Sequence, residues 1–146
     1  MRSHVPGARH PPEGVTGGAP AARSCVFCQQ CDAPEPLAAN DLAIAFPAGF
    51  PVSPGHALIV PRRHEPDFFA LTAEEQAAVV ALVNPVRAAL GKQFAPDAYN
   101  LGVNAGKAAG QTLLHTHLHV IPRYAGDVAE PRGGVRWVLP ETARYW

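Results

Sequence analysis

Three histidines at alternate positions, in HTHLHVIPRY over residues 115–124, restrict this chain more than any other feature of its sequence. In a β-strand, residues two apart point to the same face and lie roughly 6.5 to 7 Å apart. We therefore expect His115, His117 and His119 on one face of a strand, and the threonine, leucine and valine that alternate with them on the other. The apolar face can pack on a core, which leaves the histidine face for chemistry.

Two kinds of chemistry fit such a face. In the first, an H-x-H pair ligates zinc, and a catalytic zinc held by His117 and His119 would need a third ligand and an open position for water. In the second, one imidazole is a nucleophile, because a side chain with a pKa of about 6.5 is largely neutral at pH 7. The preceding segment, GVNAGKAAGQT over residues 102–112, is a loop of small residues whose backbone amides can cradle phosphate oxygens. This loop favours attack on phosphorus.

Composition argues against several classes of function. The chain has 146 residues, 47% of them hydrophobic, which favours one domain with a real core. Its formal net charge is zero and no run of like charge is longer than the pair Arg62-Arg63, so we expect no nucleic-acid partner. No apolar run approaches the roughly 20 residues of a membrane span, and residues 1–24 lack the apolar centre of a secretory signal. A cytoplasmic protein without a membrane partner is expected.

Residues 1–24 are rich in Pro, Gly and Ala and have almost no large apolar side chain, so we expect a disordered tail there. The folded domain is expected over residues 25–146. Apolar runs between turn signals predict strands at 42–46, 56–61 and 135–139, and a hairpin whose first strand lies within 99–106 and whose second strand carries the histidines. The connection of this hairpin would contain Gly106 and Gly110.

A long helix is expected after Thr72, because Thr72 and Glu75 form a capping box and apolar residues follow at helical spacing. Pro85 removes a backbone donor inside this helix, so we expect a kink in the turn before it. Gly91 or the Ala95-Pro96 pair should end the helix. Strands before and after one long helix indicate an α+β fold, with an antiparallel sheet of about five strands, one long helix and a shorter one.

The histidine run and the residues before it, QTLLHTHLHVIPRY, resemble the signature of the histidine triad (HIT) family. The resemblance extends through NLGVNAGKAAGQT and SPGHALIVPRRH back to CVFC, and it covers roughly residues 25–124. It implies a HIT-like fold, a homodimer and no organic cofactor. It also implies a nucleotide hydrolase or transferase that cleaves nucleoside monophosphate conjugates, phosphoramidates or dinucleoside polyphosphates, at the α-phosphorus. The intermediate would be a nucleotidyl-histidine.

The resemblance also implies roles for single residues. His117 would be the nucleophile, His119 would contact the phosphate and the leaving-group side, and His56 would help to orient the nucleophile. The nucleotide substrate would be bound by an asparagine and by residues of the small-residue loop: Asn104, Gly110, Gln111 and Thr112. Two rival functions stay open, a zinc-dependent hydrolase with His117 and His119 as ligands and a nucleotide-binding scaffold with little catalysis.

The chain's three cysteines, Cys25, Cys28 and Cys31, are spaced three residues apart. A C-x-x-C pair indicates zinc only together with two further ligands. In a bacterial-type branch of the same family, such a pair binds structural zinc with two histidines, which match His64 and His115 here. Cys31 is either a spare thiol or a replacement ligand for Cys28. Unligated cysteines in a reducing compartment are the alternative.

The sequence departs from the family in the strand before SPGH. Many members carry an acidic or amide residue there that holds the ribose hydroxyls, where this chain has PAG at residues 47–49. Ala48 cannot make such a bond, so the natural substrate, the base preference and the balance of hydrolysis and transfer stay open. Phe46 could pack against a base or in the core. Arg123 could neutralise a phosphate or pair with Asp127.

Overall fold

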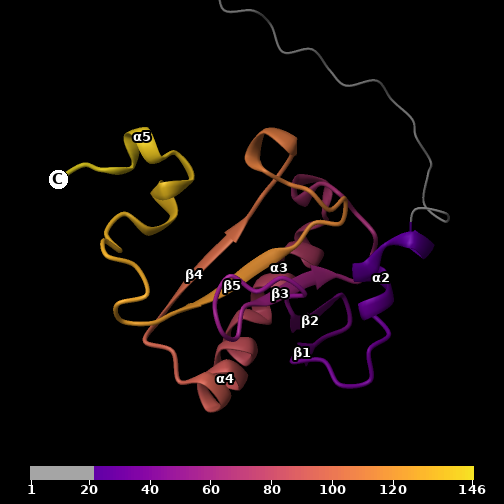
Figure 1. Cartoon of the computed structure of the whole chain (residues 1–146). Helices are drawn as coiled ribbons and strands as arrows, with labels where there is room; N and C mark the ends of the chain where they lie inside the picture. Colours follow the sequence, from indigo (N-terminus) through magenta and orange to yellow (C-terminus); the bar gives the residue numbers. More distant parts are fainter. Residues whose placement is uncertain (1–21) are drawn as a thin grey trace, which may run out of the picture.

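The computed structural model describes residues 22–146, which form one five-stranded antiparallel sheet with helices around it. The strands are β1 (Ala38–Ala39), β2 (Ala43–Pro47), β3 (Ala57–Pro61), β4 (Ala98–Val103) and β5 (Leu118–Arg123). They lie in the order β1-β2-β3-β5-β4, so β1 and β4 are the edges (Figure 1). The helices are α2 (Val26–Gln30), α3 (Ala73–Ala81), α4 (Val83–Phe94) and α5 (Pro140–Ala143), with 3-10 turns η1 (Phe68–Ala70), η2 (Lys107–Ala109) and η3 (Gly134–Val138). The expected α+β fold is confirmed.

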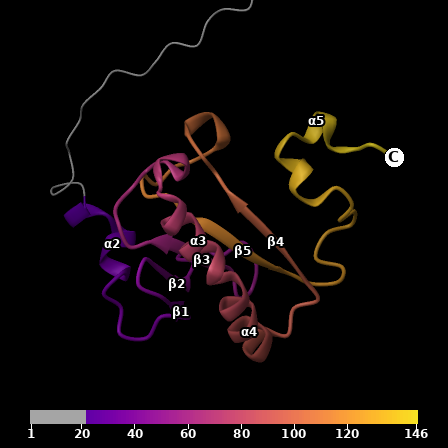
Figure 2. The same ribbon diagram turned by 180° about the vertical axis from the view of Figure 1, so that it is seen from behind.

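Two buried clusters cover the two faces of the sheet. In β2 and β3 successive side chains point to opposite faces, and alternate residues belong to alternate clusters. One cluster lies under α3 and α4, which cross one face of the sheet (Figure 2), and contains Ala43, Ala45, Ala57, Ile59, Val79, Leu82, Val86, Leu90 and Val120. The other contains Phe27 of α2 with Ile44, Phe46, Leu58 and Val60. Both faces of β2 and β3 are therefore buried, which explains why their sequences are continuous apolar runs.

The long helix begins and breaks where the sequence indicates. The hydroxyl of Thr72 accepts the Glu75 amide hydrogen at 3.1 Å, and the Glu75 carboxylate accepts the Thr72 amide hydrogen at 2.8 Å, which completes the capping box. The expected kink is a break at Leu82 that separates α3 from α4. Pro85 then lies in the first turn of α4, where a missing N–H removes no helical bond. Of the two expected ends the second is observed, because Ala95 adopts φ 48° just before Pro96.

The β4–β5 hairpin matches its prediction at the loop and differs from it at the histidines. Gly106 and Gly110 both have φ near 90°, which a side chain would oppose. The second strand begins only at Leu118, opposite Val103, so His115 and His117 precede it. The expectation that all three histidines lie within a strand is wrong, because the Thr116 amide donates to the Glu65 carbonyl at 2.7 Å and not to a sheet neighbour.

The strand expected at 135–139 is also wrong, since these residues form η3 and the link to α5. Gly133 and Gly134 have φ of 90° and 47°, so the chain turns immediately before the apolar run. Pro140 follows it, and Val135 and Val138 are exposed at 59% and 79%. A β-strand would need a neighbour for its backbone, whereas here the segment coils back on itself.

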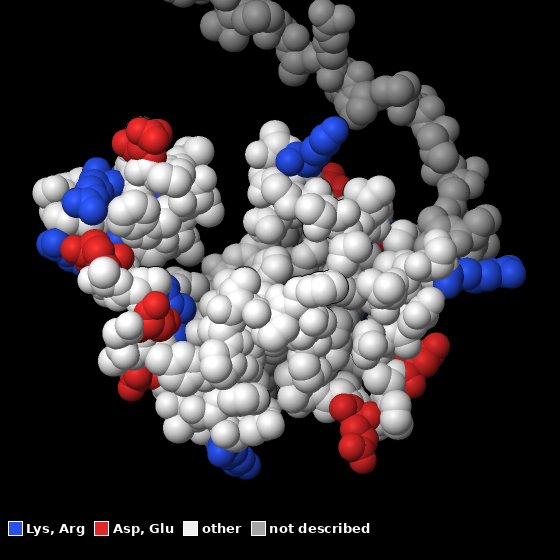
Figure 3. Space-filling model, viewed as in Figure 1, with Lys and Arg blue, Asp and Glu red and all other residues white. Residues whose placement is uncertain are grey.

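The tail expected over residues 1–24 lies outside the described residues as far as residue 21, and residues 22–24 are helical. None of the helices within 22–146 is long and apolar enough to cross a membrane. On the face shown in Figure 3, basic and acidic side chains are scattered around the rim and a broad area between them carries no charge. This face has no concentrated basic patch of the kind that nucleic-acid binding needs.

Candidate functional site

The polypeptide just before β5 joins two groups of polar side chains. His115 belongs to a cluster with two cysteines and a second histidine, whereas His117 and His119 belong to a group with His56. Only one residue, Thr116, separates His115 from His117, so the two groups share the same stretch of backbone. The rings of His117 and His119 have centroids 4.9 Å apart.

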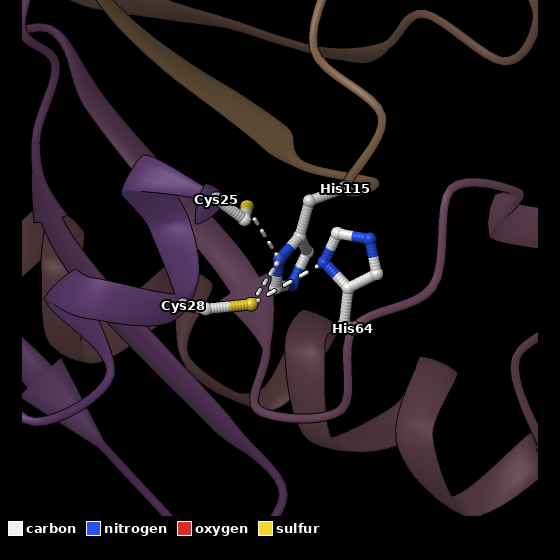
Figure 4. A group of neighbouring side chains, drawn as sticks. All are labelled: Cys25, Cys28, His64 and His115. Carbon is white, nitrogen blue, oxygen red and sulfur yellow. Dashed lines mark hydrogen bonds between the residues drawn. The ribbon is translucent and has the colours of Figure 1, made fainter. Parts of the chain in front are cut away.

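The first group is compact enough to hold a metal ion. One ligand atom from each of Cys25, Cys28, His64 and His115 lies within 4.8 Å of every other (Figure 4). The Cys28 sulfur lies 3.3 Å from Nδ1 of His64 and 3.5 Å from Nδ1 of His115. The cysteines come from α2 and its N-cap, and His64 follows β3, so the group joins three segments distant in sequence. Cys31 does not belong to it.

The protonation of His115 suits a metal ligand. The Nε2–H of His115 donates to the Pro61 carbonyl at 2.8 Å, which leaves the Nδ1 lone pair directed at the two sulfurs. Its side chain is fully buried, and burial lowers the pKa of His115, so the ring is neutral. Burial and the neighbouring Cys25 raise the pKa of Cys28 to about 11. A cation between the four side chains would favour the thiolates instead.

His64 is held in place by its sequence neighbours. Arg63 forms an ion pair with Glu75 at 2.7 Å, which ties the segment to the start of α3. The same arginine contacts Glu65 at 3.0 Å. This hydrogen-bonded pair lowers the pKa of Glu75 to about 2, with the capping bond from Thr72 contributing in the same direction. The capping box therefore also fixes the chain beside the metal-ligand candidate.

His117 presents a free ring nitrogen. Its Nδ1–H donates to the His115 carbonyl at 2.8 Å, so the lone pair lies on Nε2. The side chain is 8% exposed, and the ring of Phe27 packs against it at 72° with centroids 5.0 Å apart. An imidazole held in one tautomer, in a restricted place, is suited to nucleophilic attack through Nε2.

A chain of hydrogen bonds sets the tautomers of His56 and His119. The Val52 amide donates to Nδ1 of His56 at 3.1 Å, which leaves the His56 proton on Nε2. This Nε2–H donates to Nδ1 of His119 at 3.0 Å, so His119 carries its own proton on Nε2. Within residues 22–146 that buried Nε2 has no hydrogen-bond partner. It is a donor available to an incoming oxygen.

Both of these histidines are neutral near pH 7. Burial, followed by the neighbouring His117 and His56, lowers the pKa of His119 to about 4. Burial and His117 also lower the pKa of His56. Neutral rings keep the hydrogen-bond order described above, because each has one donor and one acceptor nitrogen.

The expected substrate-binding residues divide between two hollows. The first, of about 680 Å³, is lined by His56, His119 and Asn104 together with Val52 and residues of η3. The second, of about 880 Å³, is lined by Gly110, Gln111 and Thr112 together with Lys107 and, in and beside η1, Pro66, Asp67 and Phe69, among others. The structure therefore brings Asn104 to the histidines, whereas the three loop residues line the wall of a separate hollow.

The Gln111 side chain is fully engaged with the loop itself. Its carbonyl accepts the Gly106 amide hydrogen at 2.9 Å, and its amide donates to the carbonyls of Pro66 and Leu113 at 2.7 and 3.1 Å. Gln111 thus braces the loop against the η1 region. The glycine loop is held in one shape before any ligand binds.

The structure decides between the two interpretations that the sequence left open for Arg123 and for Phe46. Arg123 makes a two-point ion pair with Asp127 at 2.7 and 2.8 Å and donates to Asn100 at 2.7 Å, so its guanidinium is already paired. Phe46 is 4% exposed and lies 5.6 Å from Phe27 between ring centroids, so it is a core residue.

Two residues of the site were not assigned to it from the sequence. Phe27 touches His117, although only its place between the two cysteines of C-V-F-C hinted at a role. Trp137 of η3 lines the hollow with His56 and His119. Its signal was aromatic enrichment near the C-terminus, which indicates no position in space.

Comparison with known proteins gives one consistent result. The family model described as HIT domain matches residues 35–126. An uncharacterised HIT-like protein of Mycoplasma genitalium is 36% identical over 104 residues, which cover 69% of this chain and 74% of the relative. An adenosine 5'-monophosphoramidase of Schizosaccharomyces pombe is 37% identical over 103 residues, covering 68% of this chain and 74% of that protein. The crystal structure of a zinc-bound histidine triad family protein from Mycobacterium smegmatis has a TM-score of 0.66 and 33% identity, covering 75% and 81% of the two chains.

Proposed function

The chain belongs to the HIT domain family, and from this premise we propose that it is a nucleotide hydrolase or transferase. Its substrates would be nucleoside monophosphate conjugates, phosphoramidates or dinucleoside polyphosphates, cleaved at the α-phosphorus. The observation that carries the proposal is the pairing of two nitrogens on adjacent rings, a lone pair on Nε2 of His117 and an unpaired N–H on Nε2 of His119. The similarity to an adenosine 5'-monophosphoramidase supports the substrate class.

In the first step, Nε2 of His117 attacks the α-phosphorus. The nitrogen–phosphorus bond forms while the bond to the leaving group breaks, and the leaving group departs with the bonding electrons. A polyphosphate leaves as the anion, and an amine leaves as the neutral molecule when the phosphoramide nitrogen is already protonated. The phosphorylated ring becomes a cation, because Nδ1 keeps its proton. The carbonyl of His115, 2.8 Å from Nδ1, stabilises that charge.

His119 acts on the oxygens of the phosphoryl group. Its Nε2–H donates to an oxygen on which negative charge accumulates as the phosphorus becomes five-coordinate. Because the pKa of His119 is lowered to about 4, this nitrogen donates a hydrogen bond as a neutral ring and not as an imidazolium. His56 positions it through the 3.0 Å bond to Nδ1. Asn104, which lines the same hollow as His56 and His119, would bind the nucleotide there.

In the second step, water attacks the same phosphorus. The bond to His117 breaks, Nε2 regains its lone pair, and one proton of the water passes to solvent as the nucleoside monophosphate leaves. Another acceptor in place of water would give transfer instead of hydrolysis. The proposal is tested by following release of AMP from adenosine 5'-phosphoramidate. His117→Ala should abolish release, and an unchanged rate in this variant would exclude the mechanism.

We also propose that Cys25, Cys28, His64 and His115 hold a structural zinc. Two thiolates and two imidazoles are a donor set typical of tetrahedral zinc, and His115 already offers the required lone pair. The relative from Mycobacterium smegmatis is zinc-bound, which supports this proposal. With four protein ligands, no position remains for a reacting water. The ion would supply rigidity and not the nucleophile.

The rival zinc-dependent hydrolase finds less support. Nδ1 of His117 and Nδ1 of His119 are both engaged in hydrogen bonds, and Nε2 of His119 carries a proton. Across residues 22–146 the cysteine–histidine group is the one set of three or more candidate ligands close enough to share an ion. A nucleotide-binding scaffold would not need the ordered ring tautomers of His56, His117 and His119.

A homodimer is the third part of the proposal. β4 is an edge strand whose outer backbone groups pair with no other strand of the described chain, and Leu101 on it is 43% exposed. An unpaired edge with an apolar side chain is a ready surface for a second copy. Light scattering after gel filtration should give twice the mass of 15.4 kDa, and a mass of one chain at all concentrations would exclude the dimer.

A further inference from the structure

We propose that Phe27 positions the nucleophile, and that it does so because the metal-ligand candidates on either side of it hold α2 against the sheet. Phe27 is a positioning residue, since it packs against the His117 ring and would act on the reaction through that ring. The inference deepens the proposed function, because the orientation of His117 matters only where this ring carries the chemistry.

The ring of Phe27 packs against three other rings. Its ring lies 5.0 Å from His117 and 6.0 Å from His115 between centroids, and is close to perpendicular to both, at 72° and 69°. On its other side it lies 5.6 Å from Phe46. The Phe27 side chain is only 6% exposed. Perpendicular aromatic pairs at these separations favour one relative orientation, so the ring of Phe27 restricts rotation of the His117 ring.

A second restraint is needed because the hydrogen bond to His115 does not fix the ring alone. The Nδ1–H of His117 donates to the His115 carbonyl, and this bond defines the tautomer. Rotation about the side-chain torsions could still break that bond and let water compete for it. Phe27 and His119 both pack against the His117 ring, with centroids 5.0 and 4.9 Å away, and each restricts such rotation.

The sequence places Phe27 where metal binding controls it. Phe27 lies between Cys25 and Cys28 on a helix of five residues, too short to be stable by itself. The two sulfurs approach His115, whose carbonyl is the same one that accepts from His117. An ion shared by these ligands would hold in place the two groups that restrain His117, which are the His115 carbonyl and the Phe27 ring.

The test uses nitrogen NMR of the full chain, labelled at histidine and loaded with zinc. In the wild type, His117 should show a single tautomer with a slowly exchanging proton on Nδ1. Phe27→Leu keeps an apolar side chain of similar volume and should give a mixture of tautomers and fast exchange of that proton. Val60→Ala is the matched control, because Val60 belongs to the same buried cluster but has no ring against His117. A His117 signal in Phe27→Leu equal to that in Val60→Ala overturns the proposal.

Kinetics on the same variants separate this inference from the proposed function. Phe27→Leu should lower kcat for adenosine 5'-phosphoramidate about 10-fold with KM little changed, since geometry and not binding is lost. If the wild type has no activity, the proposed function fails while the NMR result still decides the role of Phe27. If the wild type is active and Phe27→Leu keeps the kcat of Val60→Ala, the positioning role is overturned.

Removing zinc tests the link to the metal site. Chelation should abolish the protected Nδ1 proton of His117 while amide signals of β2 and β3 stay dispersed, as in a folded sheet. An unchanged His117 signal in the chelated protein overturns the link. Collapse of the whole spectrum overturns it as well, because the ion would then be required for the fold and not for positioning.

Discussion

Nε2 of His56 lies 3.0 Å from Nδ1 of His119, and this bond decides which nitrogen of His119 keeps the proton. The direction follows from Val52, whose amide can only donate and so takes the Nδ1 lone pair of His56. A backbone amide in the loop before β3 thus determines, across two rings, that a donor faces the candidate phosphate site. In the proposed mechanism His56 would act on the reaction only through His119, and this effect can be measured.

His56→Leu should lower kcat by about 100-fold, a loss comparable with that of a single acid–base or oxyanion group. Leucine cannot donate to Nδ1 of His119, so the His119 proton would be shared between its two nitrogens. Steady-state kinetics with adenosine 5'-phosphoramidate give the result, with KM expected to change much less than kcat. A kcat within twofold of wild type would contradict the relay.

The lowered pKa of His119 predicts a dependence of stability on pH. The folded-state pKa of about 4 lies below the ordinary 6.5, so between these values the unfolded chain binds a proton that the folded chain does not. His119 therefore contributes stability that is fully present above pH 6.5 and is lost as the pH falls towards 4. The slope from one such group is at most about 1.4 kcal/mol per pH unit.

The comparison that isolates this effect is His119→Asn against wild type, with urea unfolding at pH 7 and pH 5 in saturating zinc. The free energy of unfolding should fall less in the variant over this interval. Zinc ligands titrate in both proteins and cancel in the difference. Equal pH slopes would show that His119 is not a buried neutral ring.

Cys28 and Cys31 should differ in their effect on bound zinc. Cys28 lies within the four-residue group and Cys31 does not, so Cys28→Ser should lose the ion and Cys31→Ser should retain it. Elemental analysis of the purified chain is expected to give one zinc per wild-type chain. Loss of the ion should lower the melting temperature, because a structural zinc contributes folding free energy. Equal zinc content in the two variants would contradict the assignment.

Ala48→Asp should strengthen recognition of ribose. Ala48 follows β2, and its amide donates to the His56 carbonyl at 2.9 Å, so position 48 lies beside the backbone of a site residue. A carboxylate there would accept hydrogen bonds from the ribose hydroxyls. KM for a ribonucleoside phosphoramidate should fall, by about 10-fold, while KM for the 2',3'-dideoxy analogue stays the same. Equal changes for both compounds would show that position 48 does not face the ribose.

Local features of the sequence predicted most of the fold. Apolar runs at 42–46 and 56–61 became β2 and β3, and the capping box at Thr72 became the start of α3. Each of these depends on a few neighbouring residues. The strand expected at 135–139 failed because Val135 and Val138, three residues apart, are equally compatible with an exposed 3-10 turn, and two glycines with positive φ precede them.

The site was only partly predictable, because its contacts join residues far apart in the chain. The resemblance implied that Cys25 and His115, which are 90 residues apart in sequence, ligate the same zinc ion. In the structure the Cys25 sulfur lies 3.5 Å from Nδ1 of His115. No pattern in the sequence shows that Phe27 packs against His117, since both would also be acceptable as ordinary buried residues. Nor does it show that the Gln111 side chain accepts from the Gly106 amide and donates to the Pro66 carbonyl, so that it joins the loop to the η1 region.

The central claim is that His117 becomes covalently nucleotidylated. Its most direct test is mass spectrometry of the intact chain, mixed with adenosine 5'-phosphoramidate and quenched in alkali within one turnover, because a phosphorus–imidazole bond is labile in acid. The account predicts a transient gain of one adenylyl unit in the wild type and none in His117→Ala. Full turnover with no adduct at any quench time would contradict it and would indicate direct attack by water.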